Sequence, residues 1–258
     1  MKVLGIGTPY PHDPSAALYI DGKLVAAVEE ERFVCEKHAP FYAATHSVKF
    51  CLKQAGLKPQ DIDVVAYPWS YEWHKNRQWR SFRRLAFSYP SRAFKSFIKT
   101  PQARETAVEK LTIALIESGF DIDKTRVEFV PHHIAHAASS FFPSGFERAA
   151  VMSFDGSGEF TSGFVGIGNG NSINVLKEWI WPDSLGALYT IFTEYCGFER
   201  NDGEYKLMGM APYGQTEKVD FSGVATLTAD DFRIHRGYYH APHHERYKDG
   251  MNFSRKLV

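Results

Sequence analysis

Two groups of short apolar segments separated by turn residues constrain the fold of this chain most strongly. The first group comprises three segments, Val3 to Gly7, Ala16 to Ile20 and Leu24 to Val28, with a hairpin signal at Asp21-Gly22. The second group comprises Val151 to Phe154, Gly163 to Ile167 and Ile173 to Trp181, with a turn signal over residues 168–171. The repetition predicts an internal duplication in which each half begins with a three-stranded meander.

Helical patterns alternate with these strands. Ala43 to Ala55 places Val48, Cys51 and Leu52 on one stripe, and Gly56 marks its end. Further short strands are predicted at residues 63–67 and 127–130, and a further helix at residues 185–195. An α/β protein with mixed β-sheets flanked by helices follows from this order.

The same pattern predicts two subdomains. The first covers residues 1–148 and carries a helical insertion at about 70–118, and the second covers residues 149–258. After Gly214 the alternation of elements weakens, so we expect the second half to be incomplete.

Composition excludes several classes of protein. The 258 residues carry 30 basic and 30 acidic side chains, so the net charge gives no case for a nucleic-acid partner. Three cysteines, an odd number without metal or redox spacing, predict a reducing, cytoplasmic setting. No segment approaches the 18 or so apolar residues of a membrane span.

Residues 73–99 interleave aromatic and basic side chains. Such a segment could contact an anionic acceptor, a membrane surface or RNA. The alternative is an inserted pair of helices whose aromatic side chains pack inward while the cations remain solvated. We favour the helical pair, because acidic residues elsewhere cancel the charge.

A histidine pair and a carboxylate predict a metal site. His132 and His136 are four residues apart, which places them on one face of a helix with about 5–6 Å between their Cβ atoms. Two imidazoles at that spacing can share one metal ion. Asp155 follows a buried strand and enters a glycine-rich segment, where its carboxylate could complete a three-ligand site. A pair of histidines without a metal would be a capping or core-edge feature instead.

Other motifs are weaker when taken singly. His12 lies in a turn of small residues and could act as a general base or bind an anionic oxygen. Glu29, Glu30 and Glu31 are typical of a solvated strand end, and Lys37 beyond them is a candidate partner for a negative charge. The glycines between Asp155 and Glu159 are typical of a phosphate-binding turn, and otherwise of a plain β-turn.

Six ordered segments together resemble the NodU/CmcH carbamoyltransferase family, which includes aminoglycoside O-carbamoyltransferases. They lie between residue 12 and residue 214 and read HDPSAAL, EEERF with Lys37-His38, HHIAHA, DGSGE, SLGALY and KLMGMAPYG. The resemblance implies a duplicated ASKHA fold (actin-like, ribonuclease H-like), close to the Kae1/TsaD tRNA-modification proteins. It also implies transfer of a carbamoyl group to a hydroxyl of a small-molecule or sugar acceptor.

The resemblance assigns a role to each motif. His132, His136 and Asp155 would bind a divalent metal, with iron favoured and zinc the alternative. His12 would be the catalytic base, and Asp13 and Lys37 would contact the acceptor or the carbamoyl group. The segment Gly156, Ser157, Gly158 and Glu159 would face a nucleotide phosphate. In the family a YrdC-like domain makes carbamoyl-adenylate from carbamoyl phosphate and ATP.

The chain departs from the family pattern in its length. We expect the rest of the second half and the YrdC-like domain to be missing, so that this chain alone does not complete the reaction. A second polypeptide could supply them. Two alternatives stay open: a catalytically inactive fragment kept for binding a partner, and a Kae1-type protein for tRNA threonylcarbamoyl transfer. The last fits less well, because Ile134-Ala135 stands where a Glu-Gly pair is expected.

Overall fold

A computed structural model describes residues 1–7, 13–86, 90, 93–94, 108–215, 222–235, 239–240 and 252–253. The chain divides into two compact units, residues 1–74 with 98–135 and residues 75–97 with 136–258. This division cuts the chain at residues 74–75 and 135–136, each within a helix, whereas the sequence pattern predicts a boundary at residue 149. No helix in the described part of the chain is both long and apolar enough to cross a membrane.

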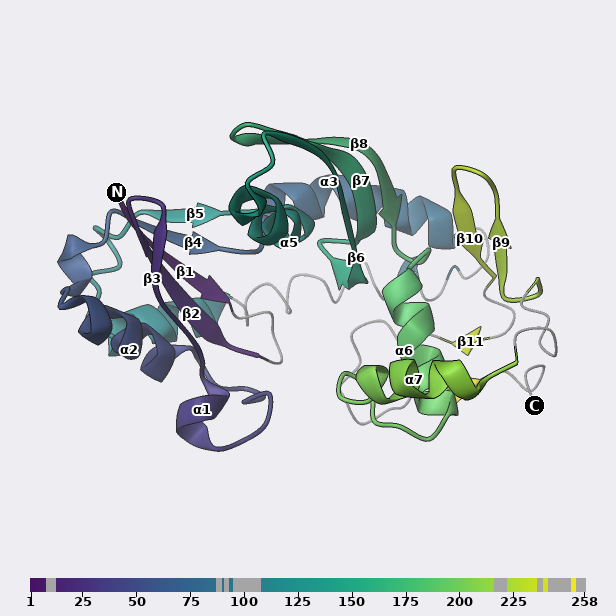
Figure 1. Cartoon of the computed structure of the whole chain (residues 1–258), viewed down its shortest axis with the longest axis horizontal. Helices are drawn as coiled ribbons and strands as arrows, with labels where there is room; N and C mark the ends of the chain where they lie inside the picture. The colour runs from purple at the N-terminus through teal and green to yellow at the C-terminus, as the bar shows by residue number, and fades with distance from the viewer. Residues whose placement is uncertain are drawn as a thin grey trace. The chain divides into compact units, whose positions relative to one another are not determined.

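The first unit is built on a five-stranded mixed sheet (Figure 1). Its strands are β1 (Lys2–Gly7), β2 (Ser15–Ile20), β3 (Lys23–Glu29), β4 (Val64–Tyr67) and β5 (Val127–Phe129), in the order β3-β2-β1-β4-β5. The first three strands are antiparallel, while β4 and β5 run parallel to β1. The predicted three-stranded meander is confirmed.

Local chemistry explains the turns and the helix of this unit. Asp21 and Gly22 both have positive φ, which suits the two-residue turn joining β2 to β3. Helix α2 (Thr45–Ala55) ends at Gly56, whose backbone is left-handed. Its stripe of Val48, Cys51 and Leu52 is buried against the sheet, as predicted. Burying each large aliphatic side chain contributes about 1.5–3 kcal/mol.

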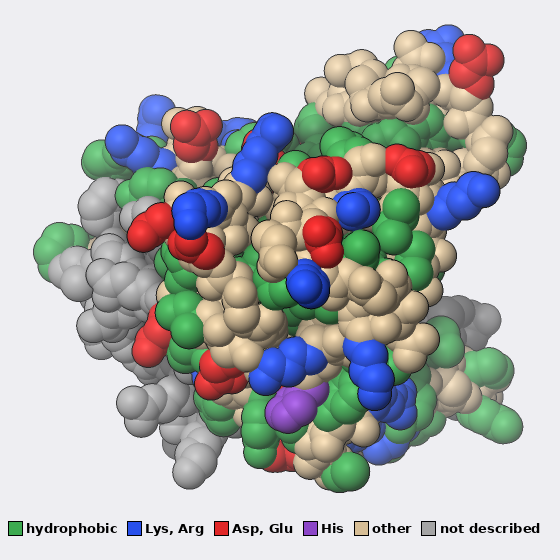
Figure 2. Space-filling view, turned by 90° about the vertical axis from the view of Figure 1, so that its left-hand side faces the viewer, with side chains coloured by type: hydrophobic (Ala, Val, Ile, Leu, Met, Phe, Trp, Pro, Cys, Tyr) green, Lys and Arg blue, Asp and Glu red, His purple; other side chains and the backbone are tan. Residues whose placement is uncertain are grey.

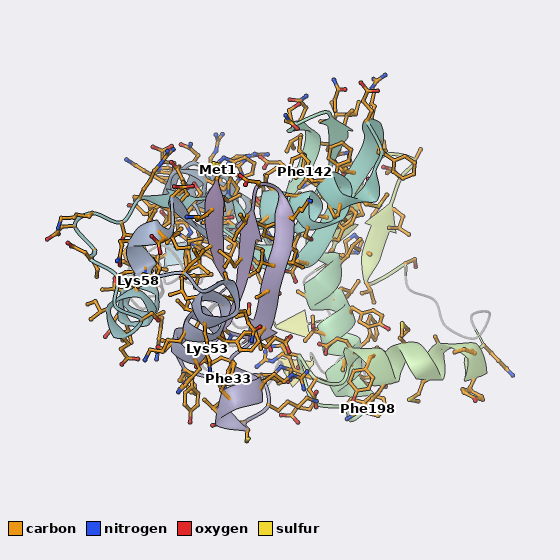
Figure 3. The ribbon with its side chains drawn as sticks, turned by 60° about the vertical axis from the view of Figure 1, so that its left-hand side comes forward. Met1, Phe33, Lys53, Lys58, Phe142 and Phe198 are labelled. Atoms are coloured by element: carbon orange, nitrogen blue, oxygen red, sulfur yellow. The ribbon has the colours of Figure 1, made fainter. Side chains whose placement is uncertain are left out.

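Shorter elements complete the first unit. They are α1 (Glu31–Val34), η1 (Pro59–Asp61) and a helix over residues 108–117. Phe33 of α1 stacks on His46 of α2, with ring centroids 5.9 Å apart. Figure 3 labels Phe33 below Lys53, which also belongs to α2. Leu111 and Leu115 of the helix at 108–117 belong to the core of the first sheet, although that helix falls within the predicted insertion.

The second unit repeats the antiparallel meander. Its strands are β6 (Arg148–Gly158), β7 (Thr161–Asn169) and β8 (Ser172–Ile180), in the order β6-β7-β8. Helix α5 (His132–Phe141) leads toward this sheet and continues into η2 (Phe142–Ser144). The Phe141 ring packs where a side chain at Gly168 would stand, 2.7 Å from that Cβ position, so only glycine allows this contact.

Helices and two small two-stranded sheets complete the second unit. The remaining elements are α3 (Tyr71–Ala86), α6 (Leu185–Tyr195), α7 (Glu204–Met210), η3 (Ala211–Tyr213), β9 (Ala225–Leu227), β10 (Phe232–Ile234), β11 (Tyr239–His240) and β12 (Asn252–Phe253). Phe160, Trp181 and Ile191 form its core together with Phe232 and Ile234 of β10. The predicted α/β class, with mixed strands flanked by helices, is confirmed.

Candidate metal centre

Helix α5 positions both predicted histidine ligands. Its first intrahelical hydrogen bond runs from the amide of Ala135 to the carbonyl of Pro131 at 2.9 Å. His132 and His136 therefore lie one turn apart on the same side of the helix. The His132 side chain is only 8% exposed and lies beside Trp69, with ring centroids 6.2 Å apart. His136 is half-exposed, so it can reach a bound ion from solvent.

Asp155 lies where strand β6 leaves its regular pairing with β7. The register shifts between Phe154 and Gly158, so the residues between them form an irregular extension of the strand. The amide of Gly156 donates to Asp155 Oδ1 at 2.6 Å, which leaves Oδ2 directed to another partner. The carboxylate is thus fixed by its own backbone before any ligand binds.

The three side chains converge on one point. Asp155 Oδ2 lies 3.5 Å from His136 Nε2, and the candidate ligand atoms of His132, His136 and Asp155 are all within 4.8 Å of one another. A separation of 3.5 Å stands at the outer limit of hydrogen-bond distance. Two ligands at about 2.1 Å from one tetrahedral ion stand about 3.4 Å apart, so this distance suits a shared cation.

The electrostatics of the cluster also favour a bound cation. The hydrogen bond and the negative charge of Asp155 raise the pKa of His136 above its usual value, although burial opposes the shift. A site that stabilises a positive imidazolium also stabilises a metal cation in its place. Two imidazoles and one carboxylate form a donor set that suits iron(II) or zinc. The residues present therefore fit the predicted metal.

Helix α6 supports the backbone that carries Asp155. Ser184 precedes this helix, accepts a hydrogen bond from the amide of Ala187 at 3.0 Å and donates toward the carbonyls of Asp155 and Gly156. Gly186 packs so closely on the Asp155-Gly156 peptide that a Cβ would collide with its backbone. Sequence reasoning missed both roles, although a serine directly before a helix is an N-cap signal.

The predicted turn from Asp155 to Glu159 is wrong in its extent. Residues 155–158 belong to β6, and the chain reverses only at Glu159 and Phe160, which both have positive φ. The cause is the bulge, which lets the strand continue past the apolar run. The Glu159 side chain is 1% exposed. The roles of Gly156, Ser157, Gly158 and Glu159 toward a nucleotide phosphate stay a prediction.

The predicted acceptor residues lie in the first unit. Asp13 Oδ1 is 2.8 Å from His38 Nδ1, next to Lys37 in the chain, so the two predicted segments do meet. The carboxylate of Glu31 lies at the same place, because it accepts a hydrogen bond from the amide of His38 at 2.8 Å. Asp13, Glu31 and His38 form a second group of possible cation ligands. His12, the predicted catalytic base, lies outside the described residues.

Glu30 departs from its prediction as a solvated residue. Its carboxylate is buried and accepts hydrogen bonds from the amides of His46 and Ser47 and from the Ser47 hydroxyl, at 3.0, 2.8 and 2.6 Å. These donors lie in the first turn of α2, where a negative charge is favourable. An alternation pattern cannot reveal such a role, because the partners are 16 and 17 residues away.

The basic side chains of α3 are engaged within the second unit. Glu178 of β8 binds Arg77 at 2.7 Å and also binds Arg80, and the buried carboxylate of Asp183 binds Arg84 at 3.0 Å. These contacts favour the structural interpretation of the aromatic and basic segment, although Arg77 is nearly buried rather than solvated. On the face in Figure 2 the basic and acidic side chains of the described residues are interspersed.

Two curated relatives are much longer than the part of them that this chain matches. An uncharacterized Synechocystis protein, sll1178, is 38% identical over 98% of this chain and 41% of its own length. The nodulation protein NolNO of Sinorhizobium fredii is 36% identical over 82% of this chain and 29% of its own length. The chain therefore spans less than half of the relatives it matches.

Two solved structures show a weak likeness. YeaZ from Pseudomonas aeruginosa has a TM-score of 0.38 at 13% identity, covering 70% of this chain and 68% of its own. The ROK hexokinase of Thermus thermophilus has a TM-score of 0.38 at 14% identity, covering 84% and 71%. The family model for the carbamoyltransferase N-terminus, in contrast, matches residues 2–256. The chain thus belongs to the carbamoyltransferase N-terminal family.

Proposed function

We propose that this chain forms the metal-binding and acceptor-binding part of an O-carbamoyltransferase. The acceptor is a hydroxyl of a small molecule or sugar, and the donor is carbamoyl-adenylate made from carbamoyl phosphate and ATP. Family membership supports the transferase class. The observation that carries the proposal further is the convergence of His136 and Asp155 at 3.5 Å beside His132.

The proposed transfer assigns a task to each group. The acceptor oxygen attacks the carbamoyl carbon, the bond from that carbon to the phosphate oxygen breaks, and AMP leaves. His12 takes the proton of the acceptor hydroxyl, and Asp13 and Lys37 orient the reacting groups. A divalent ion held by His132, His136 and Asp155 would supply Lewis-acid stabilisation and a template. The residues Gly156 to Glu159 would face the nucleotide phosphate.

Metal analysis tests the site directly. The purified chain should bind about one equivalent of iron(II) or zinc, and a chelator should lower its melting temperature, because an ion bound only by the folded state stabilises it. His136→Ala and Asp155→Asn should abolish this binding. Ser139→Ala is the matched control, since Ser139 is exposed on the same helix and bonds only to the carbonyl of His136 among the contacts described. Equal metal content in the unaltered chain and in all three variants would exclude the three-ligand site.

A transfer assay tests the reaction. The chain should be combined with the polypeptide that supplies the remaining part of the longer relatives, and carbamoyl-phosphate-dependent AMP formation and carbamoylated product should be measured. Both activities are expected only in the combination. AMP formation by this chain alone would contradict the proposed division of labour.

A further inference from the structure

Trp69 lies in the short connection between β4 and α3, at the edge of the first sheet where α5 begins. Strands β4 and β5 are parallel neighbours, so their carboxyl ends lie at the same edge of that sheet. The carbonyl oxygen of Tyr67 accepts the amide of Trp69 at 2.9 Å and the amide of Val130 at 2.8 Å. One oxygen atom thus joins the segment that carries Trp69 to the segment that leads into His132.

A connected cluster of aromatic rings forms at this edge. The Trp69 ring lies 6.2 Å from the His132 ring and 6.1 Å from the His74 ring, measured between centroids. Tyr71 stacks on His74 at 6.3 Å with 16° between the ring planes. His133 meets the His132 ring edge-on at 5.6 Å. All four separations lie within the range of about 4.5–7 Å in which aromatic rings attract one another.

Burial of this cluster distinguishes the two histidine ligands. The side chains of His74, His132 and His133 are 7%, 8% and 1% exposed, and Trp69 packs against the core of the first unit. His136, one helical turn further along, is half-exposed. A side chain packed among rings has few torsion angles open to it, whereas an exposed one can adjust to an arriving ion. The orientation of His132 therefore depends on the rings around it.

Metal-binding histidines are held in orientation by groups that do not bind the metal themselves. The usual support is a hydrogen bond to the second ring nitrogen, and a packed aromatic ring can restrict the same torsion angles. A ligand held in this way loses less conformational entropy when the metal binds. An apolar shell also limits the access of water, which strengthens the attraction between a cation and its donors.

We propose that Trp69 is a positioning residue of the metal centre, whose indole ring holds the His132 imidazole in the orientation that binds the ion and shields it from water. This role rests on the metal site of the proposed function and adds to it a residue that is no ligand. Loss of the indole ring should therefore weaken metal binding and change the geometry of the bound ion.

Zinc and cobalt(II) titrations of the purified chain test this role. Trp69→Leu keeps an apolar side chain but removes the ring, and it should weaken the binding of both ions by about 10–100-fold, the usual cost of losing such a support. Trp69→Phe keeps an aromatic ring and should recover most of the affinity. Trp79→Leu is the matched control, because Trp79 is 57% exposed on α3, and it should bind both ions like the unaltered chain.

The visible absorption spectrum of the cobalt-loaded chain separates positioning from general stability. Its bands depend on the coordination geometry, so they should change in Trp69→Leu and return in Trp69→Phe. A merely structural role would lower the melting temperature and leave the spectrum of the folded, loaded chain unchanged. Quenching of tryptophan fluorescence by cobalt(II) gives a further measurement, and most of it should be lost in Trp69→Phe.

Equal affinities and equal cobalt spectra for the unaltered chain and Trp69→Leu would overturn the role of Trp69 and leave the metal site standing. Quenching that is unchanged in Trp69→Phe would also overturn it, and this measurement does not require Trp69→Leu to fold. Failure of the unaltered chain to bind either ion would overturn the metal site of the proposed function together with this role. The two failures are therefore distinguishable.

Discussion

The hydroxyl of Ser184 lies 2.7 Å from the carbonyl oxygen of Gly156, to which it donates. The hydroxyl oxygen of Ser184 also accepts a hydrogen bond from the amide of Ala187 in the first turn of α6, so this one side chain both caps the helix and holds the segment that carries Asp155. Positioning of the candidate metal ligand thus depends on a residue that is no ligand itself.

Ser184→Ala should lower the free energy of unfolding by about 1–2 kcal/mol, because the cap and a buried hydrogen bond are lost together. Metal affinity should also fall, since the backbone at Asp155 loses its restraint. Chemical denaturation and metal titration check the two effects. Ser139→Ala, at an exposed helical position, should change neither.

Gly186→Ala should disturb the same segment from the other side. The new methyl group would meet the Asp155-Gly156 peptide, and overpacking of this kind costs about 1–3 kcal/mol. Gly209→Ala in α7 is the matched control, because no atom lies within 4 Å of its Cβ position. The control should be neutral or stabilising by up to about 1 kcal/mol. Similar melting temperatures for the two variants would exclude close packing at Gly186.

The sequence predicts this fold best where the signal is local. The hairpin at Asp21-Gly22 and the end of α2 at Gly56 are both found where positive φ demands them. The bulge before Glu159 has no such signal, because it arises from pairing between β6 and β7 rather than from residues 155–159 themselves. That is why a strand extension was predicted as a turn.

The sequence predicts the candidate site, too, only where the signal is local. Helical spacing is enough to bring His132 and His136 together, and the approach of Asp155 agrees with the predicted cluster. Ser184 and Gly186 act on Asp155 from about 30 residues further along the chain, and Glu30 acts on α2 across 16 residues. Contacts over such separations depend on tertiary packing, which periodicity does not encode.

Glu30→Ala should be among the most destabilising changes in the first unit. It removes one carboxylate and leaves several buried donors at the start of α2 without their acceptor, so the free energy of unfolding should fall by about 3 kcal/mol or more. Glu29→Ala, whose side chain is 51% exposed, should stay within about 0.5 kcal/mol of the unaltered chain. Denaturant titration of both variants checks the difference, and equal stabilities would contradict the anchoring role of Glu30.

The three cysteines should react in two groups. Burial raises the pKa of the Cys51 thiol to about 11, whereas Cys35 and Cys196 are exposed. Because the thiolate is the reactive form, Cys51 stays protonated and inert at pH 8 in the folded chain. A thiol reagent at pH 8 should therefore label Cys35 and Cys196 first, and Cys51 only after unfolding. Above pH 9 the Cys51 thiol loses its proton more readily in the unfolded chain than in the folded one. The free energy of unfolding should therefore decline as the pH rises toward 11. Mass spectrometry of labelled peptides gives the order, and rapid native labelling of Cys51 would show that α2 opens away from the first sheet.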